Sequence, residues 1–516
     1  MKTLKYWIGA AAVWVLTACS GGADYERVLP KDAAAVATVD LKAMAAKAGL
    51  QNSEGQVAMN RLADLLKSGL TDSENLIDRI VANPDESGLS LKDRLYLFVE
   101  KRSVSAGVLM RVTDEDKLTD LLEMLKEQGM CEALRESDGC TWTVMGKMLI
   151  AYNEDAFLLV MDPSGRNAGD MQHSAAKWLR QKREDSFAET EDYQSIQDAK
   201  GDISVWASMA LLPERAIYPL TMGGSAELKG EDVKALATMN FETGKLVCDV
   251  RSLTTDKVMM KVAEEYFNAT SPVKGDHLDD FPANTFGWST LSVDGAKLYK
   301  WLNSNPAVKR MFEHSMIPLD FHAIFSAVKG DVSFTVTNPL YGDYILLADV
   351  VSTDFLQTVE DLKPMIAMTG GQMRLMNRGE HAYEFYMMDG SVLNMRPGPV
   401  HVWFGVKDGK MYFTNRENLV ERKVLGLSMK NTEWGKEVEG KRVFSVVNFI
   451  SLMQTVSSTL RKQQMPPVFI GLDRLDRMTV EMREEDKMVH MELLFKDRNR
   501  NVLEQMTALV NLTTGK

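Results

Sequence analysis

Stretches in which apolar and polar residues alternate recur along the chain, and short polar turns join them in pairs. One such pair is MLIAYNEDAFLLV, which starts at Met148, and another is VHVWFGVKDGKMYFT, which starts at Val400. Alternation with a period of two indicates strands with one buried face, and connections this short indicate antiparallel hairpins.

Helical patterns occur between some of these hairpins and at the ends of the two halves of the chain, at 256–268 and 501–512. A doubly wound parallel sheet would need a helix after every strand, and that order is not found. The pattern therefore predicts an α+β fold of mostly antiparallel sheet with helices packed on one face.

Six segments of the first half recur in outline, and in the same order, in the second half. The pairs are LPKDAAAVATVD with FPANTFGWSTLSVD, GVLMRVTDEDKLTDLLEMLKE with YILLADVVSTDFLQTVEDLKPM, SDGCTWTV with MDGSVLNM, MLIAYNEDAFLLV with VHVWFGVKDGKMYFT, GDISVWASMALL with GKRVFSVVNFISLM, and TMNFETGKLVCDVRSL with TVEMREEDKMVHMELLF. This collinear order predicts an internal duplication into two tandem α+β units, residues 27–270 and 281–516, joined by a linker at 271–280.

The residues that both halves share have structural explanations. Asp40 and Asp294 precede helical patterns, where a carboxylate can cap unpaired backbone N–H groups. The Asp-Gly pairs at 138–139 and 389–390 suit tight turns. No catalytic residue recurs at matched positions, and none is predicted.

The N-terminus has the features of an export signal. Lys2 and Lys5 precede an uncharged run from Tyr6 to Val15 that is too short to span a bilayer. Leu16-Thr17-Ala18-Cys19 follows and matches the lipobox of bacterial lipoproteins. This predicts a signal peptide at 1–18, a diacylglycerol on the thiol of Cys19, and a flexible tether at 19–26. The alternative is an ordinary secretory signal in which the Cys occurs by chance.

The residues after Cys19 bear on where the lipoprotein is sorted. Ser20 is not the Asp that retains many lipoproteins at the inner membrane, which favours the outer membrane. Asp24 and Glu26 are late and separated, unlike the acidic cluster of many surface-exposed lipoproteins. We therefore expect an outer-membrane lipoprotein at the periplasmic face.

A family resemblance follows from these features. The P-x-D-A motif at 30–33, the Val39-Asp40 step into a helix, the lipobox and the duplicated length resemble an uncharacterised group of Bacteroidales lipoproteins catalogued as a domain of unknown function, number 4836. The resemblance implies an exported lipoprotein and supplies no activity.

Composition and charge narrow the list of partners. Of the 516 residues 45% are hydrophobic, which is ordinary for globular domains. The formal net charge is -12, and loss of Lys2 and Lys5 with the signal peptide lowers it by 2, to -14. Such a surface repels nucleic acid and anionic lipid, so no nucleic-acid partner is expected. The expected partner is the bilayer, through the acyl anchor, and a protein or glycan partner stays unidentified.

Three cysteines remain after Cys19. Cys131 and Cys140 flank a turn and are either a short disulfide or two free small hydrophobes on neighbouring strands. Cys248 lies in an alternating strand pattern and is expected to be a buried core thiol.

No metal or cofactor site is predicted, because neither a Cys-His zinc spacing nor a nucleotide loop occurs. Methionine is unusually frequent, with 33 residues. Met373, Met376 and Met387 near His381 form a weak alternative, a Cu(I) site, but flexible core filling explains them better.

Three functions are consistent with the sequence. The first is a non-enzymatic envelope lipoprotein that binds or scaffolds a partner. The second is a hydrolase acting on envelope material or polysaccharide, and the third is a glycan-capturing outer-membrane lipoprotein.

Overall fold

The structure of the protein is a computed structural model, and it describes residues 24–50, 52, 55–57, 60, 83–101, 105–162, 168–212, 229–315, 318–393, 397–421, 424–459, 471–483 and 485–513. The chain divides into two compact units. Unit 1 comprises residues 1–45 and 59–205, and unit 2 comprises residues 46–58 and 206–516. These units differ from the predicted repeats, whose boundaries stay a prediction.

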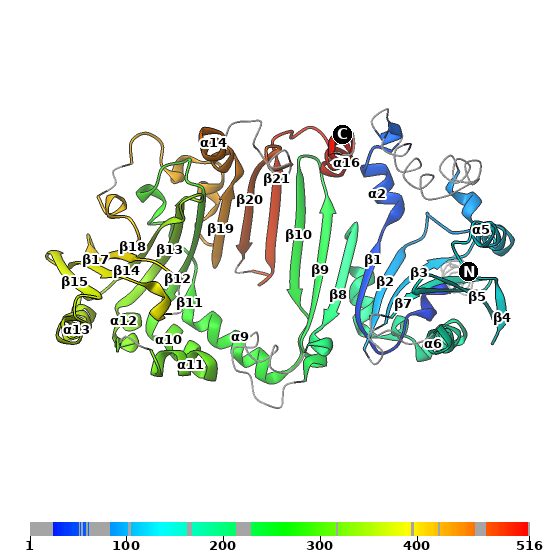
Figure 1. Ribbon diagram of the computed structural model, residues 1–516, viewed down its shortest axis with the longest axis horizontal. Helices are drawn as coiled ribbons and strands as arrows, with labels where there is room; N and C mark the ends of the chain where they lie inside the picture. The colour runs from blue at the N-terminus through cyan, green and yellow to red at the C-terminus, as the bar shows by residue number, and fades with distance from the viewer. Residues whose placement is uncertain are drawn as a thin grey trace, which may run out of the picture. The chain divides into compact units, whose positions relative to one another are not determined.

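Unit 1 is built on one antiparallel sheet (Figure 1). Its strands pair in the order β4-β5-β6-β7-β3-β2-β1. The bounds are β1 Ala33–Val39, β2 Leu95–Glu100, β3 Ala106–Arg111, β4 Arg135–Ser137, β5 Cys140–Met145, β6 Met148–Tyr152 and β7 Ala156–Met161, and β8, Ile203–Ser208, crosses from unit 1 into unit 2.

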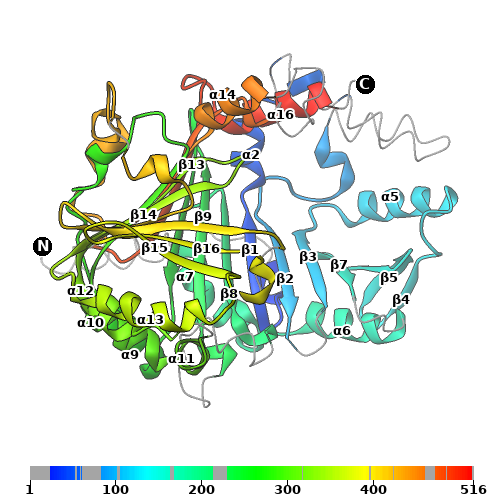
Figure 2. The ribbon, with the colours of Figure 1, turned by 60° about the vertical axis from the view of Figure 1, so that its left-hand side comes forward.

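Helices cover both faces of this sheet, not one face as predicted. Leu118 and Leu122 of α5 (Glu115–Glu127) pack against Ile150 and Tyr152. Trp178 of α6 (Ala168–Arg180) packs on Phe98, which points to the other face. The further helices are α2 Leu41–Lys47 and α7 Glu191–Asp198. Figure 2 shows α5 and α6 on opposite sides of strands β3 and β7.

Unit 2 contains a longer antiparallel sheet, in the order β9-β10-β21-β20-β19-β12-β13-β14-β18-β17-β16-β15. The bounds are β9 Lys234–Phe241, β10 Lys245–Ser252, β11 Thr270–Ser271, β12 Gly287–Asp294, β13 Val328–Asn338, β14 Asp343–Val350, β15 Met373–Gly379, β16 Ala382–Met387, β17 Val400–Lys407, β18 Lys410–Thr414, β19 Val443–Asn448, β20 Leu475–Met482 and β21 Val489–Phe495. The short strand β11 pairs with the end of β12.

The helices of unit 2 are α9 Lys257–Ala269, α10 Gly295–Ser304, α11 Pro306–Glu313, α12 Phe321–Ala327, α13 Gln357–Ala367, α14 Phe449–Thr459 and α16 Val502–Thr513. Phe355, which precedes α13, and Val359 of α13 pack against Tyr383 of the sheet. On the other face, Trp288 and Phe444 pack against Trp434 of a short 3-10 helix, Trp434–Glu437. The predicted α+β class, with mostly antiparallel sheet, is confirmed.

The two units share an order of strand pairing. The order β4-β5-β6-β7-β3-β2-β1 of unit 1 is matched by β15-β16-β17-β18-β14-β13-β12 of unit 2. Isolated bridges also correspond, with Pro30 opposite Ser186 and Pro282 opposite Ser428. The duplication itself stays a prediction, and superposition of the two strand sets in an experimental structure would test it.

Local features predicted from single residues are found. The Asp40 carboxylate accepts a hydrogen bond from the Ala43 N–H at 2.8 Å, and that of Asp294 accepts from the Lys297 N–H at 3.2 Å. Asp138 has a φ of 55° and the following glycine a φ of 74°, which is the left-handed turn that joins β4 to β5.

The predicted linker at 271–280 is held against the sheet of unit 2. The carboxylate of Asp331, on β13, is 1% exposed and accepts hydrogen bonds from the backbone N–H groups of Lys274, Gly275 and Asp276, the shortest at 2.7 Å. His277 is fully buried behind this turn. The segment is therefore fixed by buried charge-assisted hydrogen bonds.

Candidate functional site

The sheet of unit 1 buries a mainly apolar set of side chains on one face and leaves apolar side chains exposed on the other. On strand β2, Tyr96, Phe98 and Glu100 are all buried, and Glu100 is only 5% exposed. Leu97 points to the other face and is 42% exposed. Exposed apolar side chains gathered on one face of a sheet indicate a surface for binding.

The face that carries Leu97 contains a pocket of about 340 Å³. It is lined by Ala35, Ala37, Leu97, Phe98, Val99, Ala106, Gly107, Val108, Met148, Leu159, Met161 and Val205. All of these residues are apolar or glycine, and no described residue of the lining carries a charge.

The strand register explains why the face is hollow here. Ala35, Val99, Ala106, Met161 and Met148 form one row across β1, β2, β3, β7 and β6. Alanines occupy two positions of the row and leave space above the sheet, while the longer methionine side chains form a wall. Methionine adapts its shape easily to an apolar ligand.

Helix α5 covers only part of this face. It packs over Ile150, Tyr152 and Phe157, beside the pocket. Leu97 and Met161 stay 42% and 47% exposed. Covering either exposed side chain with an apolar ligand would contribute about 1 to 2 kcal/mol.

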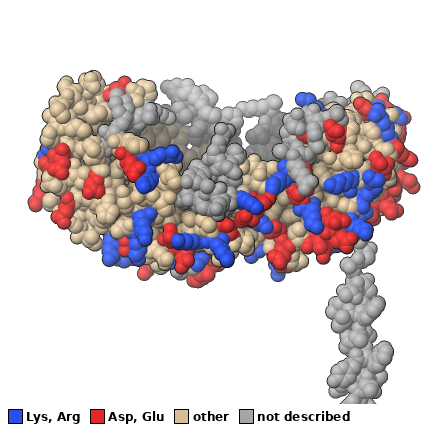
Figure 3. All heavy atoms as spheres, turned by 90° about the horizontal axis from the view of Figure 1, so that it is seen from below, with Lys and Arg blue, Asp and Glu red and all other residues tan. Residues whose placement is uncertain are grey.

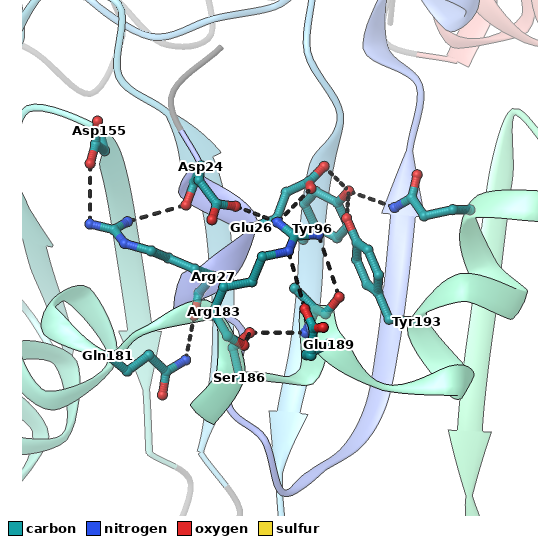
Figure 4. Close-up of polar contacts among 12 residues, drawn as sticks. Asp24, Glu26, Arg27, Tyr96, Asp155, Gln181, Arg183, Ser186, Glu189 and Tyr193 are labelled. Carbon is teal, nitrogen blue, oxygen red and sulfur yellow. Dashed lines mark hydrogen bonds and ion pairs between the residues drawn. The ribbon is translucent and has the colours of Figure 1, made fainter. Parts of the chain in front are cut away.

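The opposite face of the same strands fastens the start of the described chain. Figure 4 shows Glu26 beside Tyr96 and Tyr193. The Tyr96 hydroxyl donates to the Glu26 carboxylate at 2.8 Å and lies 3.3 Å from the Tyr193 hydroxyl. Burial, followed by the nearby Tyr193 and Glu26, raises the pKa of Tyr96 far above its usual range. Tyr96 therefore stays a neutral donor that holds Glu26.

Further contacts fix the segment 24–29 from both sides (Figure 4). Arg27 pairs with Asp155 at 3.1 Å, and Arg183 pairs with Asp24. The Gln181 side chain donates to the backbone carbonyl of Arg27 at 2.6 Å. The fixed part of the chain therefore begins five residues after Cys19. Five residues of extended chain span about 17 Å.

In unit 2, strand β13 has its polar side chains buried and an apolar side chain exposed. On strand β13, Asp331, Ser333 and Thr335 are at most 1% exposed, whereas Phe334 is 44% exposed. One row of this face crosses nine strands without a charged residue. It consists of Phe413, Leu346, Phe334, Ser289, Ser445, Val480, Met491, Cys248 and Met239.

Aromatic rings from three neighbouring strands meet at one end of this row. The ring of Tyr344 lies 5.8 Å from that of Phe334 and 6.2 Å from that of Phe413, centroid to centroid. Phe413 is 42% exposed. Composition alone gave no sign of such a platform, because it forms only when β13, β14 and β18 pair.

Charged side chains occupy other parts of the surface. Figure 3 shows Lys and Arg interspersed with Asp and Glu over much of one face. On the polar face of unit 2, His490 of β21 lies 2.5 Å from Asp249 and 3.3 Å from Glu492. Glu492 also pairs with Lys245 at 2.6 Å.

This cluster predicts a pH-dependent stability. The hydrogen bond to Glu492, with that to Asp249, outweighs burial and raises the pKa of His490 above 6.5. The His490 contribution is therefore complete below pH 6.5 and is lost as pH rises through the raised folded-state pKa. We expect His490→Gln to lower the free energy of unfolding of unit 2 by about 1 to 2 kcal/mol at pH 5.5, and by less at pH 9. Denaturant melts at both pH values measure this, and a larger loss at pH 9 would contradict it.

The contribution of Glu492 to stability depends on pH in the opposite direction. The hydrogen bond from His490, together with Lys245, lowers its pKa from 4.5 to about 2. Its contribution is present above pH 4.5 and is lost as pH falls towards 2.

The predicted lipidation site, Cys19, lies outside the described residues. Cys131 and Cys140 are free thiols in the structure. The backbone N–H of Glu132 donates a hydrogen bond to the carbonyl of Val144, near the end of β5, so Cys131 lies beside that end of the strand. Cys140 is the first residue of β5. Three or four strand positions span about 10 to 13 Å, more than the ~7 Å that a disulfide bridges. The alternative of two free thiols describes this structure.

The structure does not assemble the predicted methionine and histidine group. Met373 and Met387 face each other at one end of the β15–β16 hairpin, and His381 lies in the turn at its other end. Met376 points to the opposite face from Met373. Among the described residues no group of three or more His, Cys, Asp or Glu side chains could hold a metal ion.

One cluster combines Ser, His and Asp side chains as in many hydrolases, but it is buried and a substrate cannot reach it. The Nδ1 atom of His277 lies 2.8 Å from the Ser333 hydroxyl, and Nε2 lies 3.0 Å from the Asp349 carboxylate. Burial opposes ionisation of Asp349, but the hydrogen bond to His277 outweighs it and lowers the pKa of this carboxyl. His277 and Ser333 are both fully buried, so the cluster fixes the linker and presents no nucleophile to solvent.

Comparison with known proteins gives a family and no activity. A family model described as a domain of unknown function, DUF4836, matches residues 25–503. No curated protein matches the chain in sequence.

Among solved structures, crystal forms I and IV of TP0453 align at 11% and 10% identity with TM-scores of 0.27 and 0.26. They cover 50% and 45% of this chain and 90% and 83% of their own. The beta subunit of DNA polymerase III from Thermotoga maritima aligns at 8% identity and a TM-score of 0.10, over 90% of this chain and 99% of its own. Scores this low establish no relation of fold or function.

None of the described helices combines the length and the apolar character needed to cross a bilayer.

Proposed function

The chain belongs to the DUF4836 family, and we propose that it is an exported, lipid-anchored envelope protein that binds an apolar ligand and has no catalytic role. The proposed anchor is a diacylglycerol on Cys19, in the outer membrane at its periplasmic face. The observation that carries the binding role is the uncharged apolar pocket that stays exposed on the sheet of unit 1.

The attachment of segment 24–29 supports this proposal. A long flexible tether would let the protein sample a wide volume above the membrane. Here ion pairs and buried hydroxyls fasten the chain from Asp24 onward. A lipid on Cys19 would then keep unit 1, with its pocket, close to the bilayer.

The hydrolase alternative has less support. The one Ser-His-Asp arrangement found in the described residues is buried, and no described charged residue lines the apolar pocket. Catalysis of hydrolysis needs a general base or nucleophile within reach of the substrate.

Glycan capture is favoured by one observation, the platform of Phe334, Tyr344 and Phe413 in unit 2. A soluble neutral oligosaccharide that quenches tyrosine fluorescence in the intact chain, but not in Phe334→Ala, would support it.

Binding of the neutral apolar dye Nile red tests the main proposal. The full chain carrying Cys19→Ser, which cannot receive the lipid, needs no detergent. We expect Leu97→Asp to remove the fluorescence of Nile red bound to unit 1. Phe334→Asp should remove the fluorescence of Nile red bound to unit 2. Each substitution places a charge on an apolar surface. Leu91→Asp is the matched control, since Leu91 is 37% exposed in the same unit and lies outside the pocket. Equal binding by all variants would overturn the binding role.

A further inference from the structure

We infer that the pocket of unit 1 binds the acyl chain of a membrane phospholipid. This inference rests on the proposed function and names its ligand class. It follows from the chemistry of the lining, the shape of the row of side chains and the short distance to the tether.

The lining excludes ligands that need hydrogen bonds. No described side chain of the pocket can donate or accept one. The strand backbone beneath is already paired within the sheet, for example between β2 and β3. A peptide or a sugar would lose the water around its own N–H, C=O or hydroxyl groups without replacement, at a cost for each group. A hydrocarbon chain has no such groups.

The shape of the pocket suits a chain rather than a compact ligand. The row from Ala35 through Val99, Ala106 and Met161 to Met148 crosses five neighbouring strands. Four strand spacings give a length of about 19 Å. One leaflet of a bilayer has a hydrocarbon depth of about 15 Å, so an extended phospholipid chain would cover most of the row.

The position of the tether indicates the source of the ligand. Segment 24–29 is fixed to the same sheet as the pocket, through Tyr96, the neighbour of Leu97 on β2. Membrane phospholipid is therefore the concentrated source of hydrocarbon near this unit. The acidic character of the whole chain favours a zwitterionic headgroup over an anionic one.

Photolabelling tests the inference. The full chain with Cys19→Ser is mixed with phosphatidylcholine vesicles containing a trace of phosphatidylcholine with a diazirine on its acyl chain, then irradiated and mapped by mass spectrometry. The expected result is labelling of the peptides that contain Leu97, Val108 and Met161. Labelling should fall about tenfold or more in Leu97→Asp, a change equivalent to about 1.4 kcal/mol of binding, and stay unchanged in Leu91→Asp.

Other outcomes separate the two proposals. Labelling spread equally over exposed apolar residues outside the pocket, such as Leu91 and Met130, would overturn the acyl-chain inference. If Nile red binding still depends on Leu97 in that case, the apolar binding role stands and only the ligand class is wrong. If neither probe depends on Leu97, both proposals fail. The labelling map of the chain without a pocket substitution decides the question even if Leu97→Asp does not fold.

Discussion

Cys19→Ala is expected to abolish the incorporation of an alkyne-labelled fatty acid into the protein in cells. The thiol of Cys19 is the only group of the predicted lipobox that can accept a diacylglycerol, so alanine leaves no acceptor. The lipoprotein signal peptidase requires the modified cysteine, and the variant should therefore accumulate as the precursor that retains residues 1–18. Click labelling after immunoprecipitation measures the first effect, and intact-mass analysis measures the second.

Cys248→Ala is the matched control, because its thiol is buried on β10 and is expected to take no part in lipidation. Labelling of Cys19→Ala at the level of the control would refute the anchor.

Separation of inner and outer membranes, followed by protease treatment of whole cells, then tests the expected periplasmic face of the outer membrane. Digestion in intact cells would instead indicate the outer surface.

Asp331→Ala is expected to lower the free energy of unfolding of unit 2 by about 3 kcal/mol. Its buried carboxylate accepts hydrogen bonds from three consecutive backbone N–H groups, those of Lys274, Gly275 and Asp276. Alanine would leave these donors without an acceptor, in a site that also holds His277. Hydrogen exchange should become faster at these amides before the unit unfolds globally.

Lys329→Ala provides the control for this substitution. Lys329 is on the same strand, β13, and is exposed, so its replacement should change the free energy of unfolding by no more than about 0.5 kcal/mol. Unchanged amide exchange at 274–276 in Asp331→Ala would show that the linker is not held by this carboxylate.

Local sequence signals were sufficient for hairpins, helix caps and the fold class. The hairpin of β6 and β7 and that of β17 and β18 were predicted from alternation and turn residues, and both form. These features depend on neighbours in sequence, because a cap or a tight turn involves only three or four residues.

Within the proposed duplication, the alignment of SDGCTWTV with MDGSVLNM does not agree with the order of the strands. The Asp-Gly pair at 138–139 forms the turn between β4 and β5, but the pair at 389–390 follows β16. The turn at the corresponding place in unit 2 is formed at Glu380 and His381, between β15 and β16. A two-residue turn signal is too short to fix the register of a whole segment.

The candidate site was missed because its members come from different strands. Ala35, Leu97, Val108 and Met161 are far apart in sequence and meet only when β1, β2, β3 and β7 pair. The excess of methionine was the available signal, and it was assigned to core filling. Met148 and Met161 instead line an open pocket.

The sequence by itself determined the antiparallel hairpins and predicts the export signal, because each is encoded in a short run of residues. Only the tertiary structure decided which parts of each sheet face stay uncovered. Alternation with a period of two separates the side chains of a strand into two sets, but it does not say which set meets a helix. On β2 the covered set is Tyr96, Phe98 and Glu100, and on β13 it includes Asp331, Ser333 and Thr335. Leu97 and Phe334 stay exposed on the other faces.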